Sequence, residues 1–262
     1  MKRFLLSALA RLGLLEPAFR AYERVKAAGH RPGGAAPDGL PIPPPHLIVR
    51  VAGTADAEWF LEGGRLAAGG IRMALLRHGR AVEQLEAMLD FGCGCGRVVR
   101  NWRALPATAV HGSDRDERAV AWSREHLPFA RFETNALGPP LAYDEESFDL
   151  VYALSVFTHL TEELQFAWLA ELRRVLRPDG LVLVTTHGAA YEGRLDDEEL
   201  ERFRAGELVV RRPEAVGTNL CTAFHPEAYA RSRFGDGLVL LEHVPEGAKG
   251  NPRQDLYVLR KE

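Results

Sequence analysis

Three glycines alternate with two cysteines shortly after an acidic residue in the segment Leu89–Arg97, which reads LDFGCGCGR. Glycine lets the backbone turn sharply and lets a ligand approach closely, because it has no Cβ atom. The apolar run before this turn indicates a strand, and the helical spacing of apolar residues over 98–105 indicates a helix after it. The N-terminus of such a helix favours an anionic ligand group. We therefore expect a nucleotide-cradling element, for which an ordinary tight loop is the alternative.

The spacing of these glycines separates two kinds of nucleotide site. A dinucleotide-binding fingerprint reads G-x-G-x-x-G and would place a glycine at position 97. This chain has Arg97 there, and Asp90 lies two residues before the first glycine. The pattern disfavours an NAD(P)-dependent oxidoreductase, which stays as an alternative.

A second acidic residue, Asp114, lies about 20 residues beyond the turn, at the end of a second predicted strand. An acid at the carboxyl edge of a parallel sheet is placed to accept hydrogen bonds from ribose hydroxyls. Aspartate is also a common N-cap, so capping of a helix that starts at Arg115 is the alternative. The two roles are compatible.

Three histidines fall where predicted elements leave the sheet. His159 follows the fourth strand, His187 follows the fifth, and His225 lies after an insertion. A histidine with a pKa near neutrality suits general-base catalysis. We predict His187 as the first candidate base, His159 as the second, and His225 as a substrate contact. Capping or anchoring of loops is the alternative for each.

Strands and helices alternate from Met88 onward, which predicts a parallel sheet with helices on both faces. The two final strands are joined by a turn and are expected to be antiparallel. The predicted fold class is α/β: a doubly wound, seven-stranded, mostly parallel, Rossmann-like sheet whose last strand is antiparallel.

The regions outside the sheet divide into an arm, a linker and an insertion. Residues 1–28 predict an N-terminal helical arm of two short helices, 29–45 a Pro/Gly-rich linker, and 46–262 the main domain. Two helices are expected before the first strand, around 59–61 and 71–76. An acidic helix over 195–205 and two short strands form a lid-like insertion over about 188–225.

The composition bounds the class of protein. The 262 residues carry a net charge of −3, with 46% apolar and 26% charged residues. These values are typical of a soluble globular protein and argue against a nucleic-acid partner. Three cysteines without a disulfide framework or metal-ligand spacing indicate a reducing compartment, so we expect a cytoplasmic protein without a metal. Contact of the basic arm with a membrane surface and formation of a homodimer are left open.

Several ordered motifs resemble those of class I S-adenosylmethionine-dependent methyltransferases, in the form found among bacterial small-molecule and glycan enzymes. The residues 90–96 match the pattern D-x-G-x-G-x-G, and 148–160 look like the fourth-strand motif. The residues 169–180 resemble the signature E-x-x-R-V-L-x-P-G-G, with Asp179 in place of its first glycine, a departure expected to alter only a turn. The closing residues 254–261 resemble the last strand, and the resemblance covers about 46–262.

The resemblance implies S-adenosyl-L-methionine as the cofactor and S-adenosyl-L-homocysteine as the product. Carried over to this chain, the implied cofactor-binding residues are Asp90, Gly92, Cys93 and Gly94 around the methionine part, Asp114 at the ribose, Arg115, Asn135 and Ala136 around the adenine, and Ser155 beside the methionine part. We expect an O-methyltransferase, or an N-methyltransferase, acting on a hydroxyl or amine of a small molecule or sugar. A non-catalytic cofactor-binding partner subunit is the other alternative.

Overall fold

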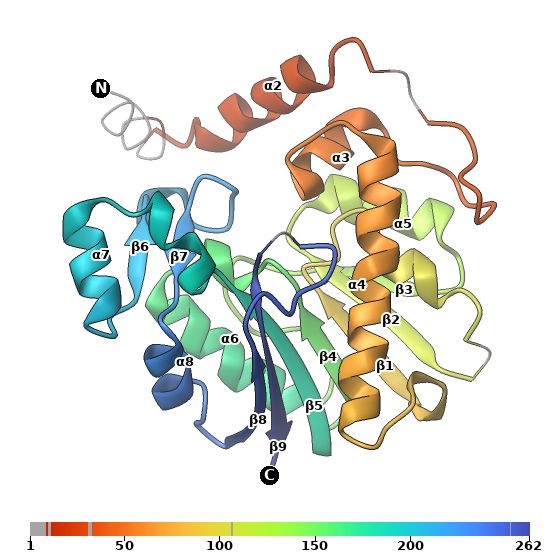
Figure 1. The fold of residues 1–262 in the computed structure, drawn as a ribbon. Coiled ribbons are helices and arrows are strands. Elements are labelled where there is room, and N and C mark those ends of the chain that lie inside the picture. Colours follow the sequence, from red (N-terminus) through yellow and green to blue (C-terminus); the bar gives the residue numbers. More distant parts are fainter. Residues whose placement is uncertain (1–8, 10–11, 31–32, 106, 252) are drawn as a thin grey trace.

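The computed structural model describes residues 9, 12–30, 33–105, 107–251 and 253–262. A seven-stranded sheet lies at its centre, in the order β3-β2-β1-β4-β5-β9-β8 (Figure 1). The strands are β1 (Ala87–Phe91), β2 (Ala109–Asp114), β3 (Arg131–Thr134), β4 (Phe148–Ala153), β5 (Leu176–Thr186), β8 (Leu238–Val244) and β9 (Asp255–Lys261). The first five pair in parallel, and β9 pairs antiparallel with both β5 and β8. The predicted fold class is confirmed.

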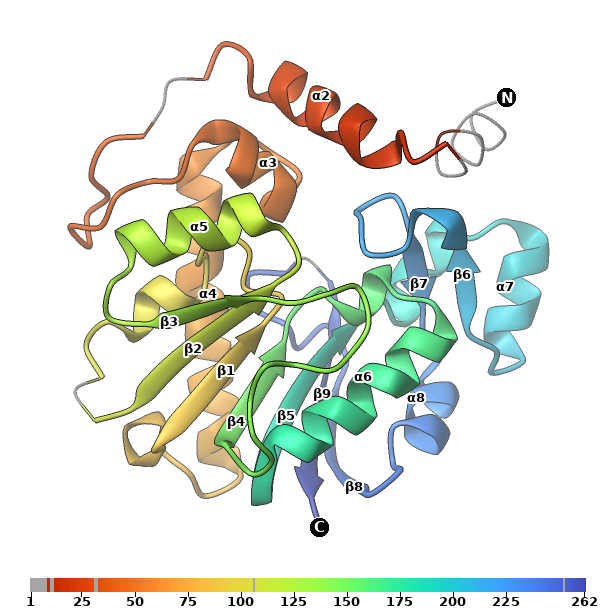
Figure 2. The same ribbon diagram turned by 180° about the vertical axis from the view of Figure 1, so that it is seen from behind.

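Helices cover both faces of the sheet (Figures 1 and 2). One face packs against α4 (Ala57–Arg77) and α5 (Glu117–His126), and the other against α6 (Glu162–Val175) and α8 (Glu227–Arg233). The alternation of side chains along a strand supplies both apolar layers. In β5, Leu181 and Leu183 belong to the α4 and α5 side, whereas Val182 and Val184 belong to the α6 and α8 side. Burial on both faces explains why these strands read as continuous apolar runs.

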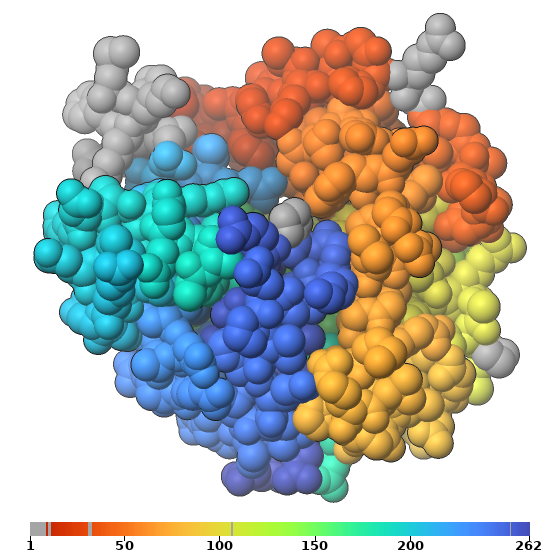
Figure 3. Space-filling model, viewed as in Figure 1, coloured from red at the N-terminus to blue at the C-terminus, as the bar shows by residue number. Residues whose placement is uncertain are grey.

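The region before the first strand differs from its prediction. Two helices were expected around 59–76, but the structure has the single 21-residue helix α4, preceded by the unpredicted α3 (Pro45–Ala52). The glycines inside α4 do not end it; they let it pack closely. A Cβ atom at Gly64 would lie 2.0 Å from the carbonyl oxygen of Arg97, and one at Gly250 would lie 2.0 Å from the carbonyl oxygen of Gly63. Figure 3 shows the segment between β8 and β9 seated against α4 on this side of the molecule.

The helix predicted after the glycine turn is also wrong in type. The chain forms only a four-residue 3₁₀ helix, Val99–Trp102. The side-chain amide of Asn101 donates to the carbonyl oxygens of Arg97 and Val98 at 3.2 and 3.1 Å. Such local bonds from a side chain compete with the backbone bonds that would extend an α-helix.

The remaining elements lie above the carboxyl edge of the sheet. The second helix of the predicted arm is α2 (Leu15–Ala27), while most of the first lies outside the described residues. The insertion contains α7 (Asp197–Arg204) and the antiparallel pair β6 (Val209–Arg211) and β7 (Thr222–Phe224). Among the described residues, no helix combines the length and the apolar character needed to cross a membrane.

Candidate functional site

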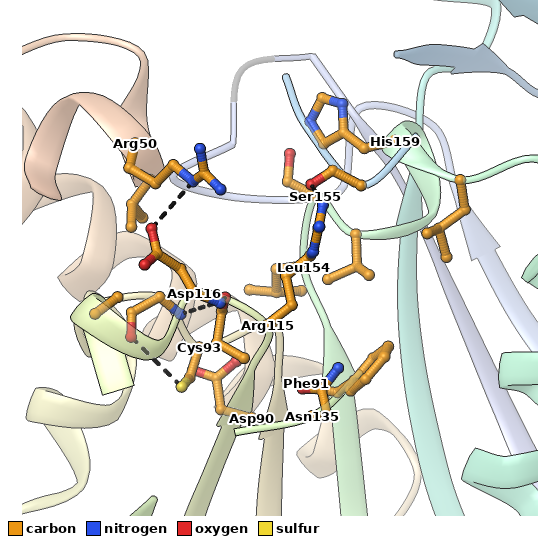
Figure 4. A pocket seen from close by; sticks show the side chains of 18 of the residues that line it. Arg50, Asp90, Phe91, Cys93, Arg115, Asp116, Asn135, Leu154, Ser155 and His159 are labelled. Atoms are coloured by element: carbon orange, nitrogen blue, oxygen red, sulfur yellow. Dashed lines mark hydrogen bonds and ion pairs between the residues drawn. The ribbon is translucent and has the colours of Figure 1, made fainter. Parts of the chain in front are cut away.

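The ends of β1, β2, β3 and β4 surround one cavity, which also has walls from α3 and the insertion (Figure 4). The chain leaves β1 toward β2 on one side and returns to β4 on the other. Ligands of doubly wound sheets bind at such a switch point, outside the carboxyl ends of the strands. All the predicted cofactor-binding residues line this cavity: Asp90, Gly92, Cys93, Gly94, Asp114, Arg115, Asn135, Ala136 and Ser155.

The floor of the cavity is the glycine turn. Gly92 and Gly94 have φ angles of +84° and +53°, in the left-handed region that favours glycine. A Cβ atom would lie 2.3 Å from Cγ2 of Val156 at the first position and 2.4 Å from Cγ2 of Val51 at the second. The side chains of Val156 and Val51, which line the cavity, therefore pack directly against the backbone of the turn.

The backbone N–H groups of this turn already have partners inside the protein. The amides of Gly92 and Cys93 both donate to the carbonyl oxygen of Ser113, at 2.7 and 3.1 Å, and the amide of Gly94 donates to Asp114 Oδ2 at 2.8 Å. Together with the missing α-helix, this contradicts the expectation that the turn attracts an anionic group. The turn is shaped for close approach, but it offers no row of free donors to a phosphate.

Asp90 places a buried carboxyl group at the cavity wall. Its side chain is 3% exposed, and its Oδ2 atom has no hydrogen-bond partner within the described structure. Burial raises the pKa of Asp90 to about 8, although a hydrogen bond from Tyr152 and the charge of Arg97 act in the opposite direction. An unpartnered buried carboxyl oxygen is costly unless a ligand completes it, and a cationic donor would do so best.

Asp114 is fixed at the end of β2 by two backbone hydrogen bonds. Its Oδ2 accepts from the amide of Gly94 and its Oδ1 from the amide of Asp116, both at 2.8 Å. Burial raises the pKa of Asp114, and these two hydrogen bonds oppose that shift. Capping of the next helix falls instead to Asp116, whose side chain accepts from the amide of Arg118 at 3.0 Å. Asp114 is therefore left to face the cavity.

The residues implied for the adenine lie on the adjoining wall. Arg115 reaches across the cavity edge and donates to the carbonyl oxygen of Gly217 in the insertion at 2.9 Å. The Asn135 side chain accepts from the hydroxyl of Ser113 at 2.7 Å and donates to the carbonyl oxygen of Ala136 at 2.7 Å. These contacts hold the β2 and β3 ends and the insertion in one surface.

Ser155 is held at the end of β4 by Gln254, which sequence analysis did not place in the site. Ser155 has a φ of +62°, and its hydroxyl accepts from Gln254 Nε2 at 2.6 Å. The buried Gln254 accepts in turn from the hydroxyl of Thr185 at 2.7 Å, and that hydroxyl accepts from the amide of Ser155 at 2.8 Å. The only sequence signal for this residue was its place at the start of the last-strand motif.

The two candidate bases lie at different depths. His159 lines the cavity, and its Nδ1 bonds to the carbonyl oxygen of Cys221 at 2.7 Å, which leaves Nε2 as the acceptor. His187 does not line the cavity; its ring lies 6.4 Å behind that of His159 and packs on Tyr191 at 4.2 Å. Burial lowers the pKa of both, and that of His187 falls to about 3.

His225, predicted to contact substrate, is fully buried and does not line the cavity. Its Nε2 bonds to Gln165 Oε1 at 3.0 Å, while its Nδ1 has no partner among the described residues. Burial lowers the pKa of His225 to about 3. The side chain lies among aromatic rings between β7 and α8 rather than at the mouth of the site.

Two further wall residues come from segments that carried no functional signal in the sequence. Arg50 belongs to α3 and Asn219 to the insertion, and the side-chain amide of Asn219 donates to the carbonyl oxygen of Arg50 at 2.9 Å. Only the tertiary fold brings them to the strand ends. No group of three or more metal-ligating side chains occurs within the described ranges.

Comparisons with known proteins agree with this arrangement. Residues 89–182 match a family model described as a methyltransferase domain. A probable S-adenosylmethionine-dependent methyltransferase of Mycolicibacterium smegmatis is 34% identical over 121 residues, which are 46% of this chain and 46% of that protein. An S-adenosylmethionine-dependent methyltransferase from Methanosarcina mazei superposes with a TM-score of 0.54 at 18% identity, over 71% of this chain and 96% of that one. A second such methyltransferase, from Mesorhizobium loti, superposes with a TM-score of 0.54 at 19% identity, over 73% of this chain and 98% of that one.

The fold and the site together define a class I, Rossmann-like methyltransferase architecture. The methyltransferase-domain match over residues 89–182 and the similarity to S-adenosylmethionine-dependent methyltransferases support the class I S-adenosylmethionine-dependent methyltransferase family, and with it S-adenosylmethionine as the cofactor. The matched regions span about half the length of the curated relatives, from Haemophilus influenzae and Mycolicibacterium smegmatis.

Proposed function

We propose that this protein is an S-adenosylmethionine-dependent methyltransferase that methylates a hydroxyl or amine of a small molecule or sugar. The observation that carries the proposal is Oδ2 of Asp90, which has no hydrogen-bond partner in the part of the chain that the structure describes and lines the same cavity as the side chain of Asp114. The first suits the cationic methionine end of the cofactor, and the second suits a ribose diol. Three buried free cysteines support a cytoplasmic location as part of the proposal.

The residues present fit this cofactor better than a dinucleotide. A pyrophosphate needs free backbone donors, but the amides of Gly92, Cys93 and Gly94 are engaged within the protein. S-adenosylmethionine has no phosphate and carries positive charge, which suits acidic side chains. When bound, it supplies an electrophilic methyl group on its sulfonium.

We propose His159 as the residue that takes the proton from the acceptor. Its Nδ1 hydrogen bond leaves the lone pair of Nε2 available, and the ring lies in the cavity wall. His187 was the first candidate from the sequence, but a histidine with a pKa of about 3 is a weak base at neutral pH. We therefore assign it a supporting position behind His159. Positioning of the acceptor then supplies the rest of the rate enhancement.

Two alternatives have less support. An NAD(P)-dependent oxidoreductase would place a pyrophosphate against amides that are not free. A non-catalytic cofactor-binding subunit would have the same cofactor cavity, so only the lack of turnover would distinguish it.

Binding of S-adenosylhomocysteine measured by calorimetry tests the cofactor. We expect stabilisation by S-adenosylhomocysteine and none by NAD⁺. Asp114→Asn is expected to weaken affinity by about 1–3 kcal/mol, because it removes the charge that strengthens hydrogen bonds from ribose hydroxyls. Asp149→Asn is the matched control: Asp149 also accepts two backbone bonds, from Glu86 and Ala87 at 2.7 and 2.9 Å, but at the opposite edge of the sheet. Equal losses in both variants would contradict the assignment.

Transfer of a labelled methyl group to a panel of hydroxyl and amine acceptors tests the reaction. His159→Ala is expected to lower turnover about 10²-fold or more with cofactor affinity retained. His187→Ala should lower it less, and His126→Ala, on the surface of α5, should leave it unchanged. Cofactor binding without turnover on any acceptor would favour the non-catalytic alternative.

A further inference from the structure

Arg50 connects the cofactor cavity to the N-terminal helix. It lies near the end of α3 with its side chain 11% exposed, and it lines the cavity. Its Nε forms an ion pair with Asp116 Oδ2 at 3.2 Å, visible in Figure 4. Its two terminal nitrogens bond to Glu23 at 3.0 Å and Glu16 at 3.1 Å, both on α2. The guanidinium also lies over the ring of Phe19, 4.9 Å from its centroid.

Glu23 is the most constrained member of this cluster. Its side chain is fully buried, and its second oxygen accepts from Arg118 at 3.1 Å. Arg118 bonds in turn to Asp116 at 2.7 Å. A buried carboxylate is tolerated only while its cationic partners stay in place, so removing one partner is far more costly than the pair is stabilising. The cluster therefore ties α2 to both α3 and α5.

The cluster influences the pKa values of Asp114, at the end of β2, and of Asp116, two residues further on. Arg118 and Arg50 outweigh the effect of burial and hold the pKa of Asp116 below its ordinary value. Burial raises the pKa of Asp114, and the Arg50 charge is among the influences that lower it. The amide of Asp116 also bonds to Asp114 Oδ1. Both the charge and the orientation of Asp114 thus depend on residues anchored from α2.

We propose that α2 is part of the cofactor-binding machinery: Glu23 holds Arg50 against Asp116, and this contact keeps Asp114 oriented for the cofactor's ribose. Glu23 and Arg50 are positioning residues in this scheme. The inference rests on the proposed function, since it assumes that the cavity binds S-adenosylmethionine. It also assigns the N-terminal arm a role that the sequence did not suggest.

The test is a double-mutant cycle on the affinity for S-adenosylhomocysteine. Glu23→Gln and Arg50→Gln are each expected to weaken binding about tenfold. The double variant should lose no more affinity than the single variant with the larger loss, because both substitutions act through one contact. Arg50→Lys keeps the charge and is expected to recover most of the affinity. Arg20→Gln is the control, because among the described residues Arg20 pairs with Glu16 alone, on the same helix, at 3.4 Å.

The linkage between cofactor binding and the docking of α2 gives a second readout, which a contact with a purely structural role would not produce. If α2 favours cofactor binding, the cofactor must stabilise the docked α2 by the same factor. S-adenosylhomocysteine is therefore expected to slow hydrogen exchange of the α2 amides in the wild type about tenfold, and much less in Arg50→Gln. Should Glu23→Gln fail to fold, Glu16→Gln carries the test with an expected loss of about threefold.

The outcomes separate this inference from the proposed function. A wild-type protein that binds no S-adenosylhomocysteine would refute the proposed function. A wild type that binds it, with Glu23→Gln and Arg50→Gln binding within twofold of wild type, would overturn the role of α2 alone. An equal loss in Arg20→Gln, additive losses in the double variant, or α2 amides indifferent to the ligand would also overturn it.

Discussion

Cofactor binding is expected to release a proton from Asp90. In the ligand-free protein, burial raises the pKa of this carboxyl group to about 8, so it is protonated at neutral pH. A cationic methionine end placed against Oδ2, which has no partner among the described residues, would favour the ionised form and draw the pKa far below 7. Binding and deprotonation are then linked.

The size of the effect follows from the titration of one group. With a pKa of about 8, about 0.9 of the carboxyl groups carry a proton at pH 7 and about 0.1 at pH 9. Binding of S-adenosylhomocysteine, whose amine is retained, is therefore expected to release about 0.9 protons at pH 7 and almost none at pH 9. Affinity should rise with pH across this range.

Calorimetry in buffers of different ionisation enthalpy, such as phosphate and Tris, measures the number of released protons. Asp90→Asn is the control, because it keeps the shape of the side chain but has no proton to release. A heat of binding that is the same in both buffers at pH 7, or a release that persists in Asp90→Asn, would refute the reasoning about this group.

Three predictions concern stability, each measured by urea unfolding. Gly64→Ala is expected to lower the free energy of unfolding by about 1–3 kcal/mol, because the added Cβ would lie 2.0 Å from a carbonyl oxygen. At Gly69 in the same helix an added Cβ would meet no described atom within 4 Å, so Gly69→Ala should raise the free energy of unfolding by up to about 1 kcal/mol. Similar changes in both variants would contradict the packing argument. The pKa of His225 is lowered to about 3, so the unfolded chain binds its proton first and stability should fall by about 2 kcal/mol between pH 7 and pH 5; the fall should shrink by that amount in His225→Gln, and an unchanged fall would exclude this histidine as its cause. Asp179 has a φ of +61°, so Asp179→Gly should raise stability by about 0.5 kcal/mol, and Asp179→Ala should not.

The sheet was predictable because the apolar pattern that marks each strand lies in consecutive residues of the sequence. Apolar runs such as 148–154 mark strands buried on both faces, and strict alternation with helices leaves few topologies. Asp114 was placed at the site because it ends a predicted strand, whereas Asp90 and Ser155, which also lie near the carboxyl ends of strands, were implied by the resemblance. Their place in the cavity follows from the topology alone.

The contacts that cross between distant segments were not predictable. The N-terminal α2, separated from α3 by the Pro/Gly-rich linker, had the pattern of an appendage, because nothing in its sequence shows that Glu23 meets Arg50 and Arg118. The relative depths of His159 and His187 depend on how the insertion folds back, through carbonyl oxygens at Cys221 and Ala223. Glycines inside α4 were misinterpreted as helix ends because a close packing partner is invisible in the sequence.

The backbone of the glycine turn, rather than the sheet, distinguishes this site from a dinucleotide site. Doubly wound sheets place a ligand at the same switch point whatever its chemistry. A pyrophosphate is held by unpaired amides at a helix N-terminus, so a turn that attracts one must leave those donors free. Here the amides of Gly92 and Cys93 bond to Ser113, that of Gly94 bonds to Asp114, and a 3₁₀ helix replaces the expected α-helix. What the cavity offers instead is the two buried carboxyl groups of Asp90 and Asp114, which suit a cationic ligand with hydroxyl groups.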